Sequence, residues 1–226
     1  MLSGAGAPCH FCDDSQVCKH NIQKGFGMYK LYAFFDLEQL NSETLERCMQ
    51  YLPEERRAKA LRYRREIDRK LSVASYLLLI YALHREFQLS APTIAYTQKG
   101  KPYLQDYPDL HFNISHCPRG CVCAVSDQPI GVDIQDIRPF SQNVANYCCS
   151  AGELLLLKQS AEPAACFAQM WSMKESYLKM TGEGIGRSLT TIDTTGPYRA
   201  IHTSYTNNCY LAVSCASFFH KEIGST

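Results

Sequence analysis

Two short segments combine acidic, amide and basic side chains at spacings that could support metal-dependent chemistry. The first is residues 131–135, GVDIQ. An acid lies here within an apolar run that is typical of a strand, and Asp133 and Gln135 share one face because strand side chains alternate. A buried carboxylate is costly unless it is paired or bound to a cation. The segment therefore indicates either a cation ligand or a carboxylate that caps a nearby loop.

The second segment, residues 171–179, WSMKESYLK, has the spacing of one helical face. Trp171, Glu175 and Lys179 follow at four-residue intervals, so on a helix they lie one above another. We expect Trp171 to anchor this face in the core and to place Glu175 and Lys179 near an interface or cleft. The simpler alternative is an exposed Glu–Lys helix pair, which contributes only roughly 0.2–0.5 kcal/mol.

Two further segments could bind an anion. The apolar run 112–116, FNISH, ends in a hydroxyl and an imidazole, which could face an anion or satisfy local backbone groups. A basic run then spans residues 56–70, and such a run is usually a solvated helix face. Here it precedes an apolar helix that begins near Ser72, so it could instead border a phosphate pocket. Its members are Arg56, Arg57, Lys59, Arg62, Arg64, Arg65, Arg69 and Lys70.

The elements that would position these residues alternate between helices and short strands. We expect strands at 28–35, 94–96, 110–115, 121–125 and 130–134, and further short strands around 192, 198–201 and 210–214. We expect helices at 42–50, from Pro53 through the basic run to about Phe87, and at 142–147, 150–159 and 163–181. The pattern lacks the regular βαβ alternation of a doubly wound sheet, so it predicts an α+β fold.

Composition narrows the class of protein further. The 226 residues carry a net charge of +1, which gives no global field for nucleic acid or an anionic membrane. No apolar stretch reaches the roughly 18–20 residues of a membrane span, and no signal peptide is apparent, so we expect a cytoplasmic protein. The twelve cysteines lie mostly in apolar runs, and we expect most of them to be reduced core thiols.

The N-terminal segment leaves two interpretations open. Cys9 and Cys12, followed by Cys18 and His20, could bind zinc tetrahedrally. The alternative is a disordered leader, because glycines flank the segment and it has no hydrophobic periodicity. We do not include zinc in the predicted function.

Taken together, segments 112–116, 131–134 and 171–179 resemble the surfactin-type 4'-phosphopantetheinyl transferases in order and spacing. The resemblance includes the Gly-x-Asp-[Ile/Val] and Trp-x-x-Lys-Glu-[Ser/Ala]-x-x-Lys signatures and extends from about Met28 to the C-terminus. It implies an α+β protein of two similar lobes, each with a small, mostly antiparallel sheet packed on helices. Accordingly, we expect a flexible N-terminal extension at 1–27 and lobes at 28–126 and 127–226, with the active site between the lobes.

The resemblance implies transfer of the 4'-phosphopantetheine moiety of coenzyme A to a serine of an apo carrier protein, with release of 3',5'-ADP. Asp133 and Glu175 would bind Mg²⁺ together with the diphosphate of coenzyme A. Position 135 is often Glu in this family, where it is a third metal ligand. Gln135 keeps an oxygen but removes a charge, which predicts weaker metal binding or a changed preference between Mg²⁺ and Mn²⁺.

The same resemblance assigns the remaining site residues. Lys174 and Lys179 would be phosphate partners, with Lys179 neutralising charge on the transferred phosphoryl group. Glu175, directly or through a metal-bound water, would accept the serine proton, so that Asp133, Glu175 and Lys179 form the catalytic set. The residues expected around the 3'-phosphate are Arg56, Lys59, Ser72 and His116, with Ser115 beside them. The residues expected to line the adenine are Lys99, Gly100, Lys101 and Pro102.

Two other functions remain as alternatives. A catalytically weakened module that binds coenzyme A or a carrier protein is supported only by Gln135. A metal or redox protein built on the N-terminal cysteines and histidine is the second. Nucleic-acid binding fits poorly because the basic run has no interleaved aromatic residue beyond Tyr63. A cleft between two lobes of one chain favours a monomer.

Overall fold

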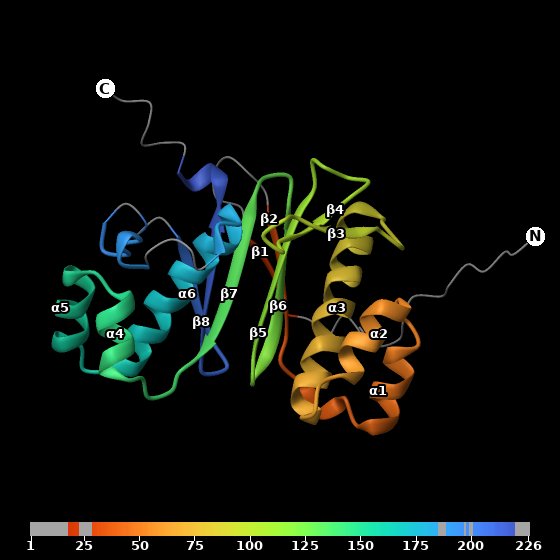
Figure 1. Ribbon diagram of the computed structural model, residues 1–226, viewed down its shortest axis with the longest axis horizontal. Coiled ribbons are helices and arrows are strands. Elements are labelled where there is room, and N and C mark those ends of the chain that lie inside the picture. Colours follow the sequence, from red (N-terminus) through yellow and green to blue (C-terminus); the bar gives the residue numbers. More distant parts are fainter. Residues whose placement is uncertain (1–17, 23–28, 185–188, 197, 199–200, 220–226) are drawn as a thin grey trace, which may run out of the picture.

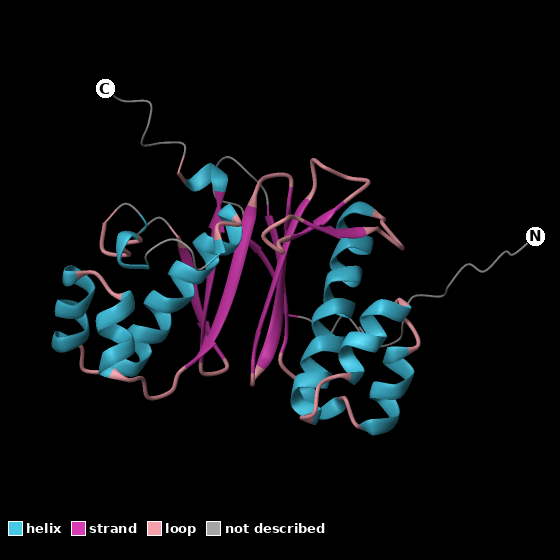
Figure 2. Cartoon of the chain, viewed as in Figure 1, coloured by secondary structure: helices cyan, strands magenta, loops and turns pink. Residues whose placement is uncertain are grey.

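The computed structural model describes residues 18–22, 29–184, 189–196, 198 and 201–219. Figure 1 shows two groups of helices at opposite ends of the molecule, with the main strands between them. Figure 2 shows the same arrangement by element type. The fold is α+β with two lobes, as the sequence predicts.

The N-terminal lobe is built on a four-stranded antiparallel sheet of order β1-β2-β6-β5. Its strands are β1 (Cys18–Ile22), β2 (Tyr29–Phe34), β5 (His111–Cys117) and β6 (Gly120–Ser126). The separate hairpin of this lobe pairs β3 (Ile94–Tyr96) with β4 (Pro102–Leu104). The N-terminal extension predicted at 1–27 thus contains a paired strand, whereas Cys9 and Cys12 lie outside the described residues.

Three helices flank this sheet: α1 (Ser42–Met49), α2 (Glu54–Leu61) and α3 (Glu66–Phe87). The predicted single helix from Pro53 to Phe87 was wrong, because the chain is extended at Arg65 between α2 and α3. The break is stabilised by two hydrogen bonds from Arg65 to Asp68, at 2.7 and 2.8 Å, and by one from Arg69 to the Tyr63 carbonyl. Helix α3 carries buried residues along most of its length, since it packs between the sheet and the outer helices.

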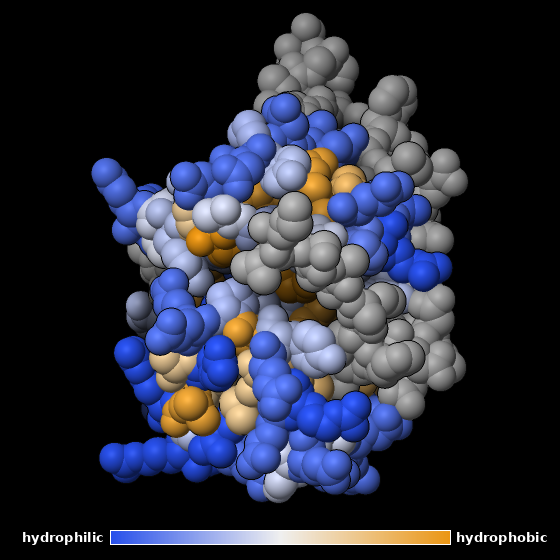
Figure 3. Space-filling model, turned by 90° about the vertical axis from the view of Figure 1, so that its right-hand side faces the viewer, coloured by the Kyte–Doolittle hydropathy of each residue, from blue (hydrophilic) through white to orange (hydrophobic). Residues whose placement is uncertain are grey.

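The outer face of these helices is largely hydrophilic among its described residues (Figure 3). Several members of the basic run, including Arg57, Arg62 and Arg64, are exposed. For these residues the solvated-face interpretation of the run holds.

The C-terminal lobe contains a three-stranded antiparallel sheet of order β7-β9-β8. Its elements are β7 (Ile130–Asp136), α4 (Gln142–Cys148), α5 (Ala151–Gln159), α6 (Pro163–Thr181), β8 (His202–Thr206) and β9 (Cys209–Cys215). Helix α6 packs across β7 and β9. The strand expected at 198–201 was misplaced: β8 begins at His202, and Ile192 follows a 3-10 turn, Leu189–Thr191.

The two lobes meet along a seam between the edge strands β5 and β7. Side chains, rather than a backbone ladder, join these strands: Asn113 Oδ1 accepts from the Val132 amide at 2.9 Å, and Ser115 Oγ donates to Asp133 Oδ1 at 2.8 Å. Behind the seam, apolar residues of β2, β6, β7 and β9 form one shared core. The seam therefore holds Ser115 of the N-terminal lobe next to Asp133 of the C-terminal lobe.

The cysteines whose side chains the structure describes are free thiols. All of them except the half-buried Cys166 are buried. This confirms the prediction of reduced core thiols for this part of the chain.

Candidate active site

Strand β7 and helix α6 approach each other at Gly131, the glycine of the Gly-x-Asp segment. A Cβ at this position would lie 2.0 Å from the Ser176 carbonyl oxygen and 2.4 Å from the Met180 amide nitrogen, so only glycine fits. The Ser176 hydroxyl also lies 2.8 Å from that of Ser214 on β9, and both side chains are fully buried. These small residues bring the two chemistry-bearing segments into direct contact.

Asp133 lies at the centre of the polar cluster that results. Its side chain is buried, and both carboxylate oxygens have partners. Oδ1 accepts from Ser115 Oγ and forms an ion pair with Lys179 Nζ, while Oδ2 accepts from Gln135 Nε2 at 2.7 Å. Lys179 Nζ also donates to Ser115 Oγ at 2.8 Å. Three elements, β5, β7 and α6, therefore meet at one buried carboxylate.

Glu175 lies on α6 one turn before Lys179 and is half-buried. Burial raises the pKa of its carboxyl group, the negative charge of Asp133 raises it further, and Lys179 lowers it. The strand acid and the helix acid are thus close enough to repel each other. A repelling pair of carboxylates is a suitable partial ligand set for a divalent cation.

The residues present fit a Mg²⁺ ion that is shared with substrate phosphates, not one that is enclosed by protein ligands alone. Among the described residues, no group of three or more His, Cys, Asp or Glu side chains is placed to hold a metal ion. Two carboxylates, Asp133 and Glu175, remain, and Mg²⁺ commonly uses one or two carboxylates plus substrate phosphates. Gln135 uses its amide nitrogen to donate to Asp133.

A cavity of about 300 Å³ opens beside this cluster, lined by residues of both lobes. It brings the predicted loop 99–102 together with Glu175 and Lys179. The complete lining is Lys99, Gly100, Lys101, Pro102, Asn113, Ile114, Glu175, Leu178, Lys179, Gly182 and Gly184. The helix of one lobe and the hairpin of the other therefore share a single pocket.

Lys101, in the turn of the β3–β4 hairpin, forms a hydrogen bond to the C-terminal end of α6. Its ammonium group donates to the Met180 carbonyl, and burial lowers its pKa. Gly182, in the left-handed conformation at φ 72°, ends the helix here, and a Cβ on it would lie 3.0 Å from Lys101 Cδ. The glycine therefore both caps the helix and leaves room for the lysine.

The predicted phosphate contact of Lys174 needs correction. This side chain is 1% exposed and forms an ion pair with Glu153 at 2.8 Å. Its ammonium group also donates to the carbonyl oxygens of Leu189 and Ile192 at 2.8 and 2.6 Å. All three partners of the ammonium group belong to the C-terminal lobe, and Lys174 is not among the residues that line the pocket. We assign it to structural support of α6.

The residues predicted around the 3'-phosphate lie on the N-terminal side of the seam. His116 is exposed, although its ring is partly removed from water. This desolvation is the main cause that lowers the pKa of His116, and the positive charges of Lys179 and Lys59 lower it further. Arg56 stacks over the Tyr76 ring at 4.9 Å, and Ser72 is half-buried on α3. His116 thus lies within electrostatic range of both Lys179 and Lys59.

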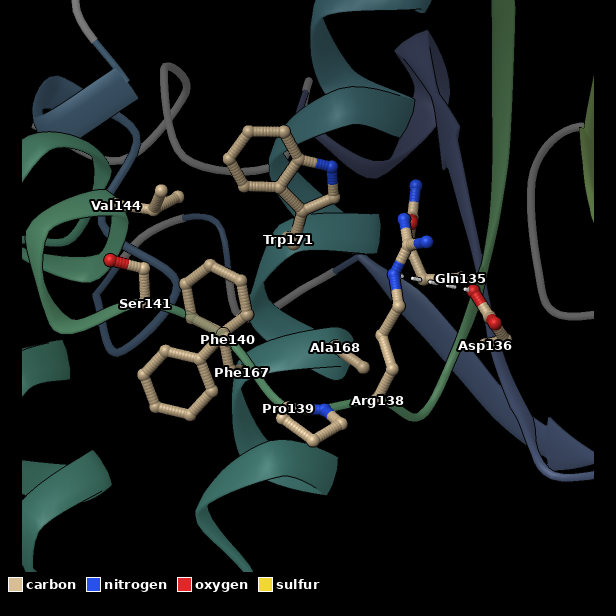
Figure 4. A pocket seen from close by; sticks show the side chains of 10 residues that line it. All are labelled: Gln135, Asp136, Arg138, Pro139, Phe140, Ser141, Val144, Phe167, Ala168 and Trp171. Carbon is tan, nitrogen blue, oxygen red and sulfur yellow. Dashed lines mark ion pairs between the residues drawn. The ribbon is translucent and has the colours of Figure 1, made fainter.

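Trp171 packs against the core of the C-terminal lobe, as predicted, but lies at its margin. It is half-buried and, together with Gln135, lines a second cavity of about 320 Å³ (Figure 4). Phe140 stacks on Phe167 at 4.4 Å between ring centroids, and Phe167 lies 5.9 Å from Trp171. The sequence analysis missed this cavity, although an aromatic residue four positions before Trp171 on one helix was a usable signal. Its lining is Gln135, Asp136, Arg138, Pro139, Phe140, Ser141, Val144, Phe167, Ala168 and Trp171.

Comparisons with known proteins agree with this geometry. Residues 129–218 match the family model described as the 4'-phosphopantetheinyl transferase superfamily, and residues 39–128 match the one described as 4'-phosphopantetheinyl transferase, N-terminal. The 4'-phosphopantetheinyl transferase Sfp of Bacillus subtilis is 35% identical over 71% of this chain and 73% of its own length. The psf-1 transferase of Bacillus pumilus is 36% identical over 64% of each chain, and HetI of Nostoc is 31% identical over 54% of this chain and 60% of its own.

The chain therefore belongs to the 4'-phosphopantetheinyl transferase superfamily. Within it, the similarity to Sfp confirms the resemblance to the surfactin-type transferases that the three sequence segments indicate.

Proposed function

We propose that this protein transfers the 4'-phosphopantetheine moiety of coenzyme A to a serine of an apo carrier protein, in a Mg²⁺-dependent reaction that releases 3',5'-ADP. Membership of the transferase family supports the reaction class. The observation that carries the proposal is the cluster in which Asp133, Glu175 and Lys179 converge beside a pocket shared by both lobes.

Asp133 and Glu175 would hold Mg²⁺ together with the diphosphate of coenzyme A. The bound ion would supply neutralisation of negative charge on the diphosphate oxygens. Gln135 has two proposed roles, as a neutral oxygen ligand after rotation of its amide or as a donor that orients Asp133. Its present hydrogen bond to Asp133 Oδ2 favours the second role.

Glu175 is the proposed acceptor of the serine proton. It lines the pocket, where its carboxylate is placed to accept a proton from a hydroxyl group bound there. The serine oxygen forms a bond to the phosphorus that carries pantetheine, the proton moves to Glu175, and the bond from phosphorus to 3',5'-ADP breaks. Lys179 neutralises charge on the transferred phosphoryl group, because its ammonium group lies at the pocket wall.

The substrate would lie along the seam. We place the adenine against Lys99, Gly100, Lys101 and Pro102. The first three residues lie in the turn between β3 and β4, and Pro102 is the first residue of β4. The 3'-phosphate is placed near Arg56, Lys59, Ser72, Ser115 and His116. Lys174 has no part in this arrangement because its ammonium group is buried elsewhere.

The proposed partner is an acyl or peptidyl carrier protein, and the proposed enzyme is a cytoplasmic monomer that does not bind nucleic acid. One chain supplies both walls of the pocket, which supports a monomeric site. No helix in the described part of the chain has the length and apolarity that a bilayer crossing requires.

The test is incubation with coenzyme A, Mg²⁺ and a panel of apo carrier proteins, followed by intact mass measurement of each carrier. We expect a gain of one phosphopantetheinyl group on at least one carrier and none on its Ser→Ala variant. Coenzyme A binding without any mass gain across the panel would instead support the second candidate function, a binding module weakened by Gln135.

A further inference from the structure

The lobe seam has a third side-chain contact that plays no part in the proposed reaction. Asn113, Ser115 and Cys117 alternate along β5, so their side chains share one face. The first two bond to Val132 and Asp133 of β7. Cys117 continues the row, and its sulfur lies 3.6 Å from that of Cys209 on β9.

Both thiols belong to the core that the two sheets share, and they are 5% and 0% exposed. Each also stands at the end of a tight hairpin. Cys117 pairs with Gly120 across the exposed turn at 118–119, and Cys209 follows a turn in which Asn207 and Asn208 have positive φ. A disulfide requires the sulfur atoms to approach to about 2.05 Å, a closure of roughly 1.5 Å that side-chain rotation at two hairpin ends can supply.

We propose that Cys117 and Cys209 are a redox-modification site, at which a reversible disulfide covalently joins the N-terminal lobe to the C-terminal lobe. The oxidant is a hydroperoxide such as hydrogen peroxide, and a dithiol reductant reverses the bond by exchange. The disulfide fixes the spacing of β5 and β9 two residues from Ser115.

The oxidation proceeds in two balanced steps. The Cys117 sulfur attacks one peroxide oxygen, so an S–O bond forms, the O–O bond breaks, and water leaves behind a sulfenic acid. The Cys209 sulfur then attacks the Cys117 sulfur, the S–S bond forms, the S–O bond breaks, and a second water carries away the hydroxyl group and the thiol proton. The two thiols lose two electrons to the peroxide.

We assign the first attack to Cys117 from its position. Either sulfur can donate in the contact between the two thiols, and the Cys209 thiol also lies 3.5 Å from the Asn207 carbonyl oxygen, to which it donates. Backbone N–H groups of Arg119 and Gly120 lower the pKa of Cys117. Cys117 also adjoins the exposed turn, where a small peroxide has the shortest path.

Cys148 and Cys149 provide an internal comparison. Their sulfur atoms lie 3.9 Å apart, almost as close as those of Cys117 and Cys209. They are adjacent in sequence, however, so their Cα atoms are about 3.8 Å apart, below the usual range of about 4.4–6.8 Å for disulfides. We therefore expect the pair between the lobes to oxidise in preference to the adjacent pair.

The experiment treats the full chain with hydrogen peroxide, blocks residual thiols, and maps disulfides by mass spectrometry without reduction. The tryptic peptide that contains Cys117 has no other cysteine, and chymotrypsin separates Cys209 from Cys215 at Tyr210. We expect a Cys117–Cys209 peptide pair that disappears with dithiothreitol. We also expect the oxidised protein to unfold about 5–10 °C higher than the reduced protein.

The variants Cys117→Ala and Cys209→Ala should each abolish this shift, whereas Cys166→Ala, at a half-buried cysteine on α6, should retain it. Mapping of the unmodified chain decides the proposal even if a variant fails to fold. Conversion of Cys117 to a sulfinic acid while Cys209 stays a free thiol, or a bond from Cys117 to another cysteine, would overturn it.

Discussion

Lys179 and Asp133 form an ion pair across the junction of α6 and β7, and the same ammonium group donates to Ser115 of the other lobe. One lysine therefore connects the helix and the edge strands of both sheets at the proposed reaction centre. The ion pair also offsets part of the cost of burying the Asp133 carboxylate.

Removal of either proposed metal-binding carboxylate should nearly abolish transfer. We expect Asp133→Ala and Glu175→Ala each to lower the rate of carrier labelling at least ~100-fold, the size of single electrostatic or acid–base contributions. The measurement is single-turnover labelling at saturating coenzyme A, with circular dichroism to show that each variant is folded. Near-normal labelling by either folded variant would refute its assigned role.

Gln135→Glu should make the site more dependent on Mg²⁺. The change replaces an amide that donates to Asp133 with a third negative charge, so repulsion destabilises the metal-free protein and a cation relieves it. We expect a lower thermal midpoint than wild type without Mg²⁺ and a larger rise on Mg²⁺ titration. Gln135→Ala is the control, since it removes the hydrogen bond and adds no charge. Equal Mg²⁺ responses of the three proteins would exclude a role for position 135 in metal binding.

Lys174→Met should reduce stability rather than coenzyme A binding. The variant leaves the carboxylate of Glu153 buried without its cationic partner, although Thr194 still donates to it at 2.6 and 2.9 Å. Breaking a buried pair in this way costs about 3–5 kcal/mol, measurable by urea unfolding. Lys158→Met, on the exposed side of α5, is the matched control and should change little. A stable Lys174→Met protein with weakened coenzyme A affinity would restore the phosphate role.

Gly131→Ala should separate α6 from β7. The added methyl group would lie 2.0 Å from a helix carbonyl oxygen, and backbone atoms cannot move aside as a flexible side chain can. We expect a loss of about 1–3 kcal/mol in unfolding free energy, together with a drop in labelling rate. Gly152→Ala on α5 is the control, because its nearest neighbours would be side-chain atoms, the closest being Thr195 Oγ1 at 3.1 Å. A fully active, stable Gly131→Ala protein would show that this close approach is not needed.

The sequence predicted the site best where periodicity is local. Alternation placed Asp133 and Gln135 on one face, where the structure joins them by a hydrogen bond, and the four-residue spacing placed Glu175 and Lys179 on one wall of a pocket. The resemblance assigned Lys174 to a phosphate contact, whereas the structure pairs its ammonium group with a buried carboxylate. Its buried partner Glu153 lies 21 positions away, and no local pattern identifies it.

Other features depended on tertiary contacts and were not predictable from spacing. The break between α2 and α3 is stabilised by a hydrogen bond from Arg69 to the Tyr63 carbonyl oxygen. The residue types of the basic run would equally suit a continuous helix. The cavity that Trp171 lines is completed by Phe140, which lies in the loop after β7. Sequence spacing thus predicted which residues lie together more reliably than which surfaces enclose them.

The way β5 meets β7 has a consequence for how such a protein can change over time. Each sheet completes its own backbone ladder, and Asn113 and Ser115 bridge the remaining gap. Asn113 also lines the pocket between the lobes, so a substitution there would reshape that wall while leaving both backbone ladders whole. The cost of such a change would lie in the Val132 amide left without its side-chain acceptor, and not in either sheet.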